Sequence, residues 1–295
     1  MRRTKGSVLV LAALVGGAIL VFRPGPKVDS PRRRLPDPVA AESAPESPRV
    51  PQPAPAPSSL PSPAVKALAA PSVPSFPRLG GTPLGGVVHG DVRLTAAPAR
   101  KKWIVMDADP RCASLHAGRV PSEEVVVDAK LGVRWAFVYV KEGARPAVAP
   151  AVPMLLAQSG CRYDPHVVGI QVGQPLLVRN DDPLLHNIHA LPFANQVFSF
   201  GQPAQGQEGR VWFKTPEVMV QVRCDVHPWM TAWIGVLDHP YFAVTDSAGA
   251  YALPELPPGF YTVEVWHEAY RSVAKRIELN PGEETVLNFR LDDRK

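Results

Sequence analysis

The chain is poor in cysteine: its 295 residues include only three, at positions 112, 161 and 224. Disulfide-rich secreted scaffolds and paired zinc knuckles both need more cysteines than this, so the count excludes them. We expect a disulfide between Cys112 and Cys161 if the chain lies in an oxidising compartment, which leaves Cys224 as a free thiol. The alternatives are a second metal site that combines these two cysteines with His116 and His166, or two unpaired thiols in the core.

The part of the chain that can fold also lacks an excess of positive charge. The net charge is +5, but residues 1–80 hold 11 Lys and Arg against 4 Asp and Glu, whereas the remaining residues hold 21 against 23. Domains that bind nucleic acid carry a basic face on their folded part. We therefore expect no nucleic-acid partner.

Aromatic residues are nearly absent before residue 80, where nearly half of the 35 prolines lie. Such a composition cannot bury enough apolar surface to offset the entropy cost of ordering the chain. Residues 24–80 are therefore predicted to be a disordered proline-rich linker, with polyproline II conformation favoured around residues 51–57.

The first residues combine a basic start with an uncharged apolar stretch. Arg2, Arg3 and Lys5 precede residues 6–22, which contain no charge. This pattern is typical of a signal anchor with its basic end in the cytoplasm, and a cleaved export signal is the alternative. We expect residues 1–23 to tether the chain to a bacterial inner membrane, with the rest in the periplasm or cell envelope.

Long segments with helical periodicity are also missing. From residue 81 onward, short apolar alternations are separated by Gly, Pro, Asn and Asp, which is typical of an all-β protein. Among the strands predicted are residues 87–94, 103–106, 133–141, 218–223 and 273–279. A turn of helix is expected at residues 114–116 and in the loop at residues 194–207. Many short strands with regular turns favour a Greek-key sandwich.

The most informative stretch is the heptapeptide Cys-Asp-Val-His-Pro-Trp-Met at residues 224–230. Cys224, His227 and Met230 supply a thiolate, an imidazole and a thioether. A trigonal set of two His and one Cys with a weak axial Met is the type 1 copper arrangement. The second imidazole is predicted to be His186, whereas His189, three residues later on an extended segment, should face away.

Two further residues of the loop suit electron transfer. Pro228 stiffens the loop because its φ angle is fixed, so the ligands would move little when the metal changes charge. Trp229 is expected to form an apolar patch for a redox partner beside His227, which we place at an exposed edge. The alternative is structural: a thiol and a thioether that fill the core, and a histidine on the surface.

Residues 224–230, together with His186 and Asn187, resemble the cupredoxins, and the loop spacing is that of the amicyanins. The likeness covers roughly residues 165–236 and extends more broadly to the bacterial methylamine utilisation proteins with a cupredoxin domain. It implies a Greek-key sandwich or barrel, one type 1 copper and the carriage of one electron. It also implies that Asn187 ties the two ligand loops together.

A second pattern occupies the carboxyl-terminal residues. Asp246-x-x-Gly249 is followed by Pro257-Pro258-Gly259-x-Tyr261, which resembles the carboxypeptidase regulatory-like, transthyretin-like β-sandwich. We accordingly expect a cupredoxin-like domain at residues 81–239 and a small sandwich segment at 240–295. The segment is short for an independent sandwich, so it is expected to borrow strands from residues 87–94 or from the cupredoxin-like part.

The function predicted from these residues is that of a membrane-tethered periplasmic copper protein that carries single electrons between redox partner proteins. We expect a carrier and not an enzyme, because His89, His116 and His239 are scattered singly and form no further copper cluster. The alternative is a cell-envelope protein that binds another envelope protein or carbohydrate through its carboxyl-terminal segment. Its copper loop would then be vestigial or would store copper.

Overall fold

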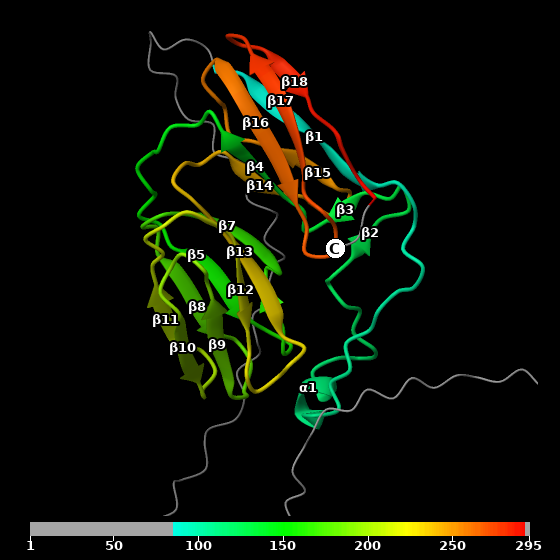
Figure 1. The fold of residues 1–295 in the computed structure, drawn as a ribbon. Coiled ribbons are helices and arrows are strands. Elements are labelled where there is room, and N and C mark those ends of the chain that lie inside the picture. The colour runs from blue at the N-terminus through cyan, green and yellow to red at the C-terminus, as the bar shows by residue number, and fades with distance from the viewer. Residues whose placement is uncertain (1–84, 293–295) are drawn as a thin grey trace, which may run out of the picture. The chain divides into compact units, whose positions relative to one another are not determined.

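The computed structural model describes residues 85–292, whose regular secondary structure is β-strand apart from one short helix (Figure 1). The all-β expectation is confirmed for this part of the chain. The predicted anchor at 1–23 and the predicted linker at 24–80 both lie outside the described residues. Within residues 85–292, no helix is long and apolar enough to cross a membrane.

The first sandwich packs a five-stranded sheet against a four-stranded one. The five-stranded sheet has the order β10 (Phe198–Gln202), β9 (His186–Leu191), β12 (Glu217–Arg223), β13 (Thr231–Leu237), β7 (Val167–Gln171). The other has the order β11 (Glu208–Val211), β8 (Leu176–Asn180), β5 (Met154–Gln158), β6 (Tyr163–Asp164). Because side chains alternate across a strand, alternate residues such as Val220 and Val222 enter a shared core between the sheets.

The second sandwich is built from strands at both ends of the described chain. One sheet has the order β14 (Phe242–Val244), β4 (Phe137–Glu142), β16 (Gly259–Trp266), β17 (Val273–Leu279). The other has the order β15 (Ala250–Ala252), β1 (Val87–Leu94), β18 (Glu284–Val286), with β19 (Phe289–Leu291) also paired to β1. The remaining elements are the pair β2 (Val126–Val127) and β3 (Val133–Arg134) and the helix α1 (Pro110–Ser114).

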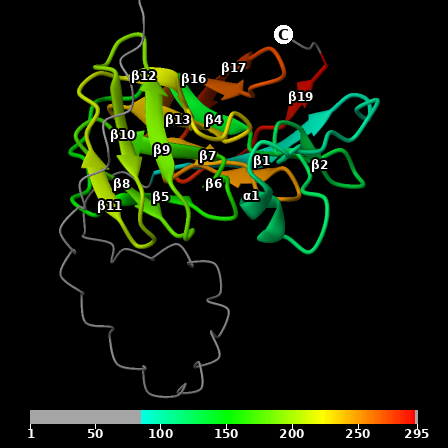
Figure 2. The ribbon, with the colours of Figure 1, turned by 90° about the horizontal axis from the view of Figure 1, so that it is seen from below.

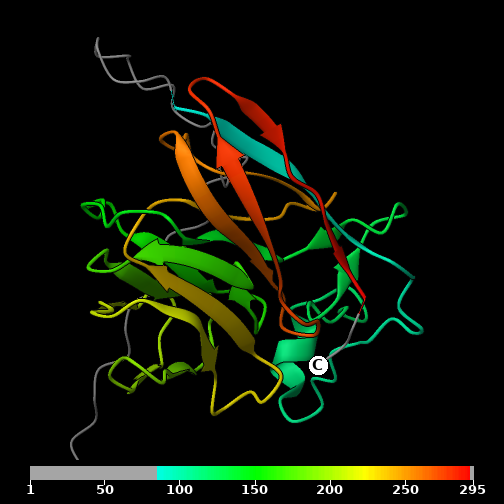
Figure 3. The ribbon, with the colours of Figure 1, turned by 45° about the horizontal axis from the view of Figure 1, so that its top comes forward.

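Strand β1 pairs with three strands from the carboxyl-terminal segment. It is antiparallel to β15 and parallel to β18 and β19. Figure 3 shows it in cyan among the red strands. The prediction that this segment borrows strand 87–94 is confirmed. The domain boundaries 81–239 and 240–295 stay predictions, but strand pairing does not follow them, since β1 and β4 both pair beyond residue 240.

The two sandwiches pack against each other through β4 (Figure 2). Val138 and Val140 point into the core of the second sandwich, while Phe137 points the other way, toward β7 and β13. Glycines make room for its ring: a Cβ built on Gly235 would lie 2.4 Å from Phe137 Cζ, and one on Gly169 would lie 2.8 Å from Phe137 Cε2. This aromatic ring therefore fills a hollow that only glycine can provide.

Four local predictions differ from the structure. Residues 103–106 form no strand, and Trp103 makes only an isolated bridge to Pro121. The single strand expected at 133–141 is two strands, because Trp135, with φ of 68°, breaks the extended backbone. The first helical turn lies earlier than expected, at α1, because Asp109 caps it and Pro110 occupies its first turn. The loop at residues 194–207 forms no helical turn.

The glycine hollow gives a test of how the sandwiches pack. Gly235→Ala should lower the free energy of unfolding by about 1–3 kcal/mol, because the added methyl group overlaps the buried Phe137 ring. Gly118→Ala is the matched control, since a Cβ there meets nothing within 4 Å. Urea denaturation of both variants measures the difference. Equal stability of the two variants would contradict this packing.

Candidate metal centre

The structure brings His186, Cys224 and His227 together at one end of the first sandwich. His186 opens β9, Cys224 directly follows β12, and His227 lies in the loop that leads to β13. Because these three strands are neighbours in one sheet, residues far apart in sequence meet. One donor atom from each residue lies within 4.8 Å of the others, and all three residues are buried.

The two imidazoles face each other through the same ring nitrogen. Their Nδ1 atoms are 2.9 Å apart, and Cys224 Sγ lies 3.8 Å from His227 Nδ1. Each outer nitrogen has a carboxylate partner: His186 Nε2 is 2.9 Å from Asp182, and His227 Nε2 is 3.4 Å from Asp109.

A neutral imidazole carries one N–H, and a carboxylate accepts it. The Nε2 protons are therefore directed outward, and both Nδ1 lone pairs point into the same buried space beside the sulfur. Metal-binding histidines usually have this arrangement, with the outer N–H held by a carboxylate. A space lined by two lone pairs and a thiol requires a proton or a metal cation.

The environment of Cys224 favours its thiolate. Burial acts to raise the pKa of the thiol, but hydrogen bonds from His186 and from the backbone N–H groups of Asn187, His227 and Val226 lower it below its ordinary value. A thiolate is the form that binds a metal.

The two imidazoles differ in pKa. Burial acts to lower the pKa of His186, but hydrogen bonds to Asp182 and Cys224 outweigh it and raise the pKa. Burial lowers the pKa of His227, and the neighbouring His186 lowers it further, against the opposing hydrogen bond to Asp109. Without a metal, the shared proton therefore resides on His186.

This donor set fits copper. Two imidazole nitrogens and one thiolate suit a trigonal type 1 site better than a hard cation, which prefers oxygen ligands. Met230 is buried at the end of the same loop, where its N–H donates to the His227 carbonyl and its carbonyl accepts from Cys224 N–H. Its role as the fourth, weak ligand stays a prediction.

Asn187 connects the two ligand segments, as the cupredoxin likeness implied. Its side-chain oxygen accepts a hydrogen bond of 2.6 Å from Asp225 N–H, and its Nδ2 donates to the Asp225 carboxylate at 3.0 Å. The residue after one ligand thus binds the residue after the other. His189 lies outside the cluster and pairs with Asp225 at 3.0 Å.

Cys112 and Cys161 form a disulfide, as expected, with their Cα atoms 5.6 Å apart. The alternative second metal site is not formed, because both thiols are used in the bond. Its two histidines have other partners: His116 Nε2 contacts the Gly160 carbonyl at 2.9 Å, and His166 pairs with Glu268.

The expectation that His227 lies at an exposed edge was wrong. Its exposed fraction is 1%, because α1 and Asp109 lie against its outer side. Trp229, expected to give an apolar docking patch, is half-buried. Its ring centroid is 5.2 Å from that of His227, and its Nε1 donates to the Cys161 carbonyl.

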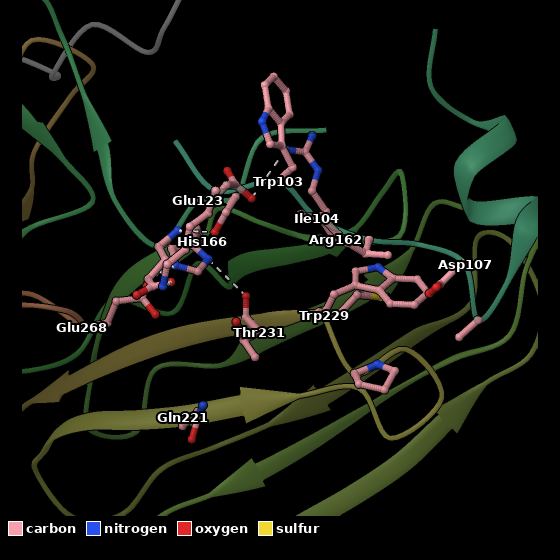
Figure 4. Close-up of a pocket in the computed structure, with 17 residues that line it drawn as sticks. Trp103, Ile104, Asp107, Glu123, Arg162, His166, Gln221, Trp229, Thr231 and Glu268 are labelled. Carbon is pink, nitrogen blue, oxygen red and sulfur yellow. Dashed lines mark hydrogen bonds and ion pairs between the residues drawn. The ribbon is translucent and has the colours of Figure 1, made fainter. Parts of the chain in front are cut away.

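A cavity of about 650 Å³ adjoins the ligand loop on the side of Trp229 (Figure 4). Pro228, Trp229 and Met230 line it together with charged groups that include Arg162 and the His166–Glu268 pair. The surface beside the loop is therefore polar as well as aromatic, and not the dry patch that we expected from the sequence.

Two functional residues escaped the sequence analysis, Asp109 and Asp182. Asp182 lies four residues before His186, in a turn-rich stretch that draws attention to backbone conformation and not to ligands. Asp109 could have been recognised as a helix cap by the Asp-Pro sequence, but nothing local connects it with a histidine 118 positions away.

Comparison with known proteins supports the two resemblances to different extents. Residues 234–292 match the carboxypeptidase regulatory-like domain family. No curated protein matches the chain.

Solved structures similar to the chain include cupredoxins. A purple cupredoxin from Nitrosopumilus maritimus aligns at 22% identity and a TM-score of 0.24, over 28% of this chain and 97% of that one. A copper(I) form of an amicyanin variant aligns at 16% identity and 0.26, over 34% and 97%.

A copper-containing nitrite reductase from Thermus scotoductus SA-01 aligns at 24% identity and 0.28, over 33% of this chain. That alignment spans only 25% of the reductase. All three TM-scores are low.

The two histidines should titrate in a fixed order in the metal-free chain. As the pH rises, His227 should lose its proton first, because its pKa is lowered, and His186 should keep its proton longest. Nitrogen-detected NMR titration of both rings measures the order.

Asp182→Asn removes the carboxylate that raises the pKa of His186 and should bring its titration to lower pH. Asp181→Asn, whose carboxylate pairs with Arg179, should leave it in place. The reverse order of titration, or equal effects of the two substitutions, would contradict the assigned contacts.

Proposed function

We propose that the chain is a type 1 copper protein that carries single electrons. The observation that carries this proposal is the convergence of the two Nδ1 atoms and the Cys224 sulfur in one buried space, with both outer nitrogens held by carboxylates. Copper bound there would alternate between copper(II) and copper(I). His186, Cys224 and His227 would hold it in a plane, with Met230 as the weak fourth ligand.

The protein supplies rigidity around these ligands. Asn187 joins the two ligand segments through Asp225, and Pro228 restricts the loop between the ligands. The disulfide fixes the neighbouring residue 161, whose N–H donates to Asp182, the carboxylate behind His186. Ligands held in this way move little when the metal charge changes, which favours fast electron transfer.

The proposal includes an exported location. A disulfide between buried cysteines is typical of proteins in oxidising compartments, which supports a periplasmic or cell-envelope address. We propose that residues 1–23 tether the chain to the membrane and that residues 24–80 give it reach toward redox partner proteins. This chain would carry electrons and not transform a substrate.

The carboxyl-terminal match supports a second role for the same chain. Carboxypeptidase regulatory-like sandwiches are compact β-modules, and here the module packs directly on the copper-site sandwich through Phe137. It could hold the carrier against an envelope protein or a carbohydrate. A protein with this role alone, with a vestigial or copper-storing loop, is the alternative function.

Loading with copper distinguishes the two functions. Copper(II) added to the full-length chain should produce an intense visible absorption band, because charge transfers from the Cys224 thiolate to the metal. Cys224→Ser should abolish the band. Visible and electron paramagnetic resonance spectra measure it, and a mild reductant should bleach the band, which a mild oxidant should then restore.

His189→Ala is the matched control, because His189 lies on the same strand as His186 but outside the cluster. It should leave the band unchanged, whereas His186→Ala should remove it. Copper binding without an intense band, or a band that survives Cys224→Ser, would reject the electron carrier and favour the storage or interaction alternative.

A further inference from the structure

Residues 95–125 lie over the outer side of His227 and are anchored in the core of the first sandwich. They contribute the buried side chains of Met106, Cys112 and Val120 to that core, and Ile104 packs against it. These residues belong to neither sheet of the first sandwich. The segment is therefore an addition to the sandwich that is held by its own apolar anchors.

Asp109 is the point where this segment meets the metal ligands. It caps α1 by accepting a hydrogen bond from Arg111 N–H at 3.0 Å, and its Oδ2 also accepts from Arg111 Nη2 at 2.8 Å. The same Oδ2 lies 3.4 Å from His227 Nε2. The two contacts with Arg111 hold the Asp109 carboxylate on one side. On its other side, the carboxylate is therefore a fixed hydrogen-bond acceptor for His227.

The disulfide links the supports of both imidazoles. On one side, Cys112 belongs to α1, which Asp109 caps. On the other, Cys161 and Gly160 donate their N–H groups to Asp182, the partner of His186, at 2.7 Å and 2.8 Å. The carboxylates behind His186 and His227 are thus held by two segments that one covalent bond joins.

We propose that residues 95–125 form a permanent intramolecular cap over the metal site, with Asp109 as the residue that positions His227. The cap occupies the edge by which His227 would otherwise reach solvent or a partner. Trp229 is left as the ring that lies between His227 and the neighbouring cavity, so a redox partner meets Trp229 and not the His227 ligand. The proposal rests on the same cluster as the proposed function. It concerns the access of solvent and partners to that cluster, which the cap restricts whether or not a metal is bound.

Cys224 reports on the cap without any metal. It is buried, and the other two cysteines of the chain are joined in the disulfide, so it is the one free thiol. Its alkylation by iodoacetamide in the metal-free, full-length chain requires the site to open. The labelling rate is followed by mass spectrometry at several pH values. Its plateau at high pH is the limiting rate of the fully ionised thiolate, which does not depend on the pKa of the thiol.

Two substitutions should open the cap by different means. Asp109→Ala removes both the helix cap and the His227 contact, and Met106→Ala removes an apolar anchor without changing the charge. Each should raise the limiting labelling rate about tenfold or more, since opening of a local segment becomes easier. Asp109→Asn keeps an acceptor oxygen and the helix cap, and should stay within about twofold of the parent rate.

Asp107→Ala is the matched control, because Asp107 is an exposed carboxylate two residues before Asp109 on the same segment. It should label at the parent rate. Urea midpoints of all variants show whether labelling reflects opening of the cap or global unfolding. Parent-like labelling of Asp109→Ala and Met106→Ala, or equal acceleration by Asp107→Ala, would overturn the cap.

The two proposals fail separately. A chain that gives no copper band but shows the expected labelling pattern retains the cap and loses the electron carrier. A chain with the copper band in which Asp109→Ala and Met106→Ala label like the parent remains an electron carrier and loses the cap.

Discussion

Two imidazole nitrogens that face each other 2.9 Å apart beside a buried thiol are the constraint on which the rest of the site depends. Two buried nitrogen lone pairs this close together are costly unless a proton or a metal cation lies between them. The arrangement persists only if other contacts prevent the rings from turning away. The surrounding contacts have this effect: a carboxylate behind each ring, an amide between the ligand segments and a disulfide beside them.

Three parts of the structure supply the residues of the site and their contacts: the sheet, the loop after β12 and the segment at residues 95–125. Neighbouring strands of one sheet bring His186 to Cys224, and a tight loop brings His227 to the same place. The segment at residues 95–125 then supplies Asp109 from outside the sandwich. The sheet sets the positions of these residues. Residues 95–125 then restrict the rotation of the His227 ring, which would be free if His227 lay in an exposed loop.

The convergence of His186, Cys224 and His227 could be predicted from the sequence, because two of them lie in one short loop and the third lies at the start of a strand. The disulfide followed from assigning Cys224 to the metal, which leaves Cys112 and Cys161 to pair, and strand 87–94 followed from its alternating pattern. The covering of His227 could not be predicted. The short strand and helical turn predicted within residues 95–125 do not indicate what the segment covers, and the contact of Asp109 with His227 arises only from tertiary packing.

For most strands, the sequence also could not predict which other strands they pair with. A pattern of alternating residues indicates that a strand has a buried face, but not which strand lies beside it. Phe137 illustrates this: its neighbours Val138 and Val140 predict a strand, yet the reason for an aromatic ring on the opposite face is a pair of glycines in β7 and β13. Only the folded chain brings them together.

The pairing of β4 with β14 has a consequence for how the chain is assembled. All strands of the first sandwich, β5 to β13, occur between these two, and the segments that lead out and back are joined by a hydrogen bond of 2.8 Å from Ala147 N–H to the Asp238 carbonyl. The first sandwich is therefore inserted into one hairpin connection of the second sandwich, whose own first and last strands, β1 and β19, lie side by side. The cluster of His186, Cys224 and His227 nevertheless depends on both parts of the chain, because residues 95–125, which precede β4, supply Asp109 to His227 and Cys112 to the disulfide.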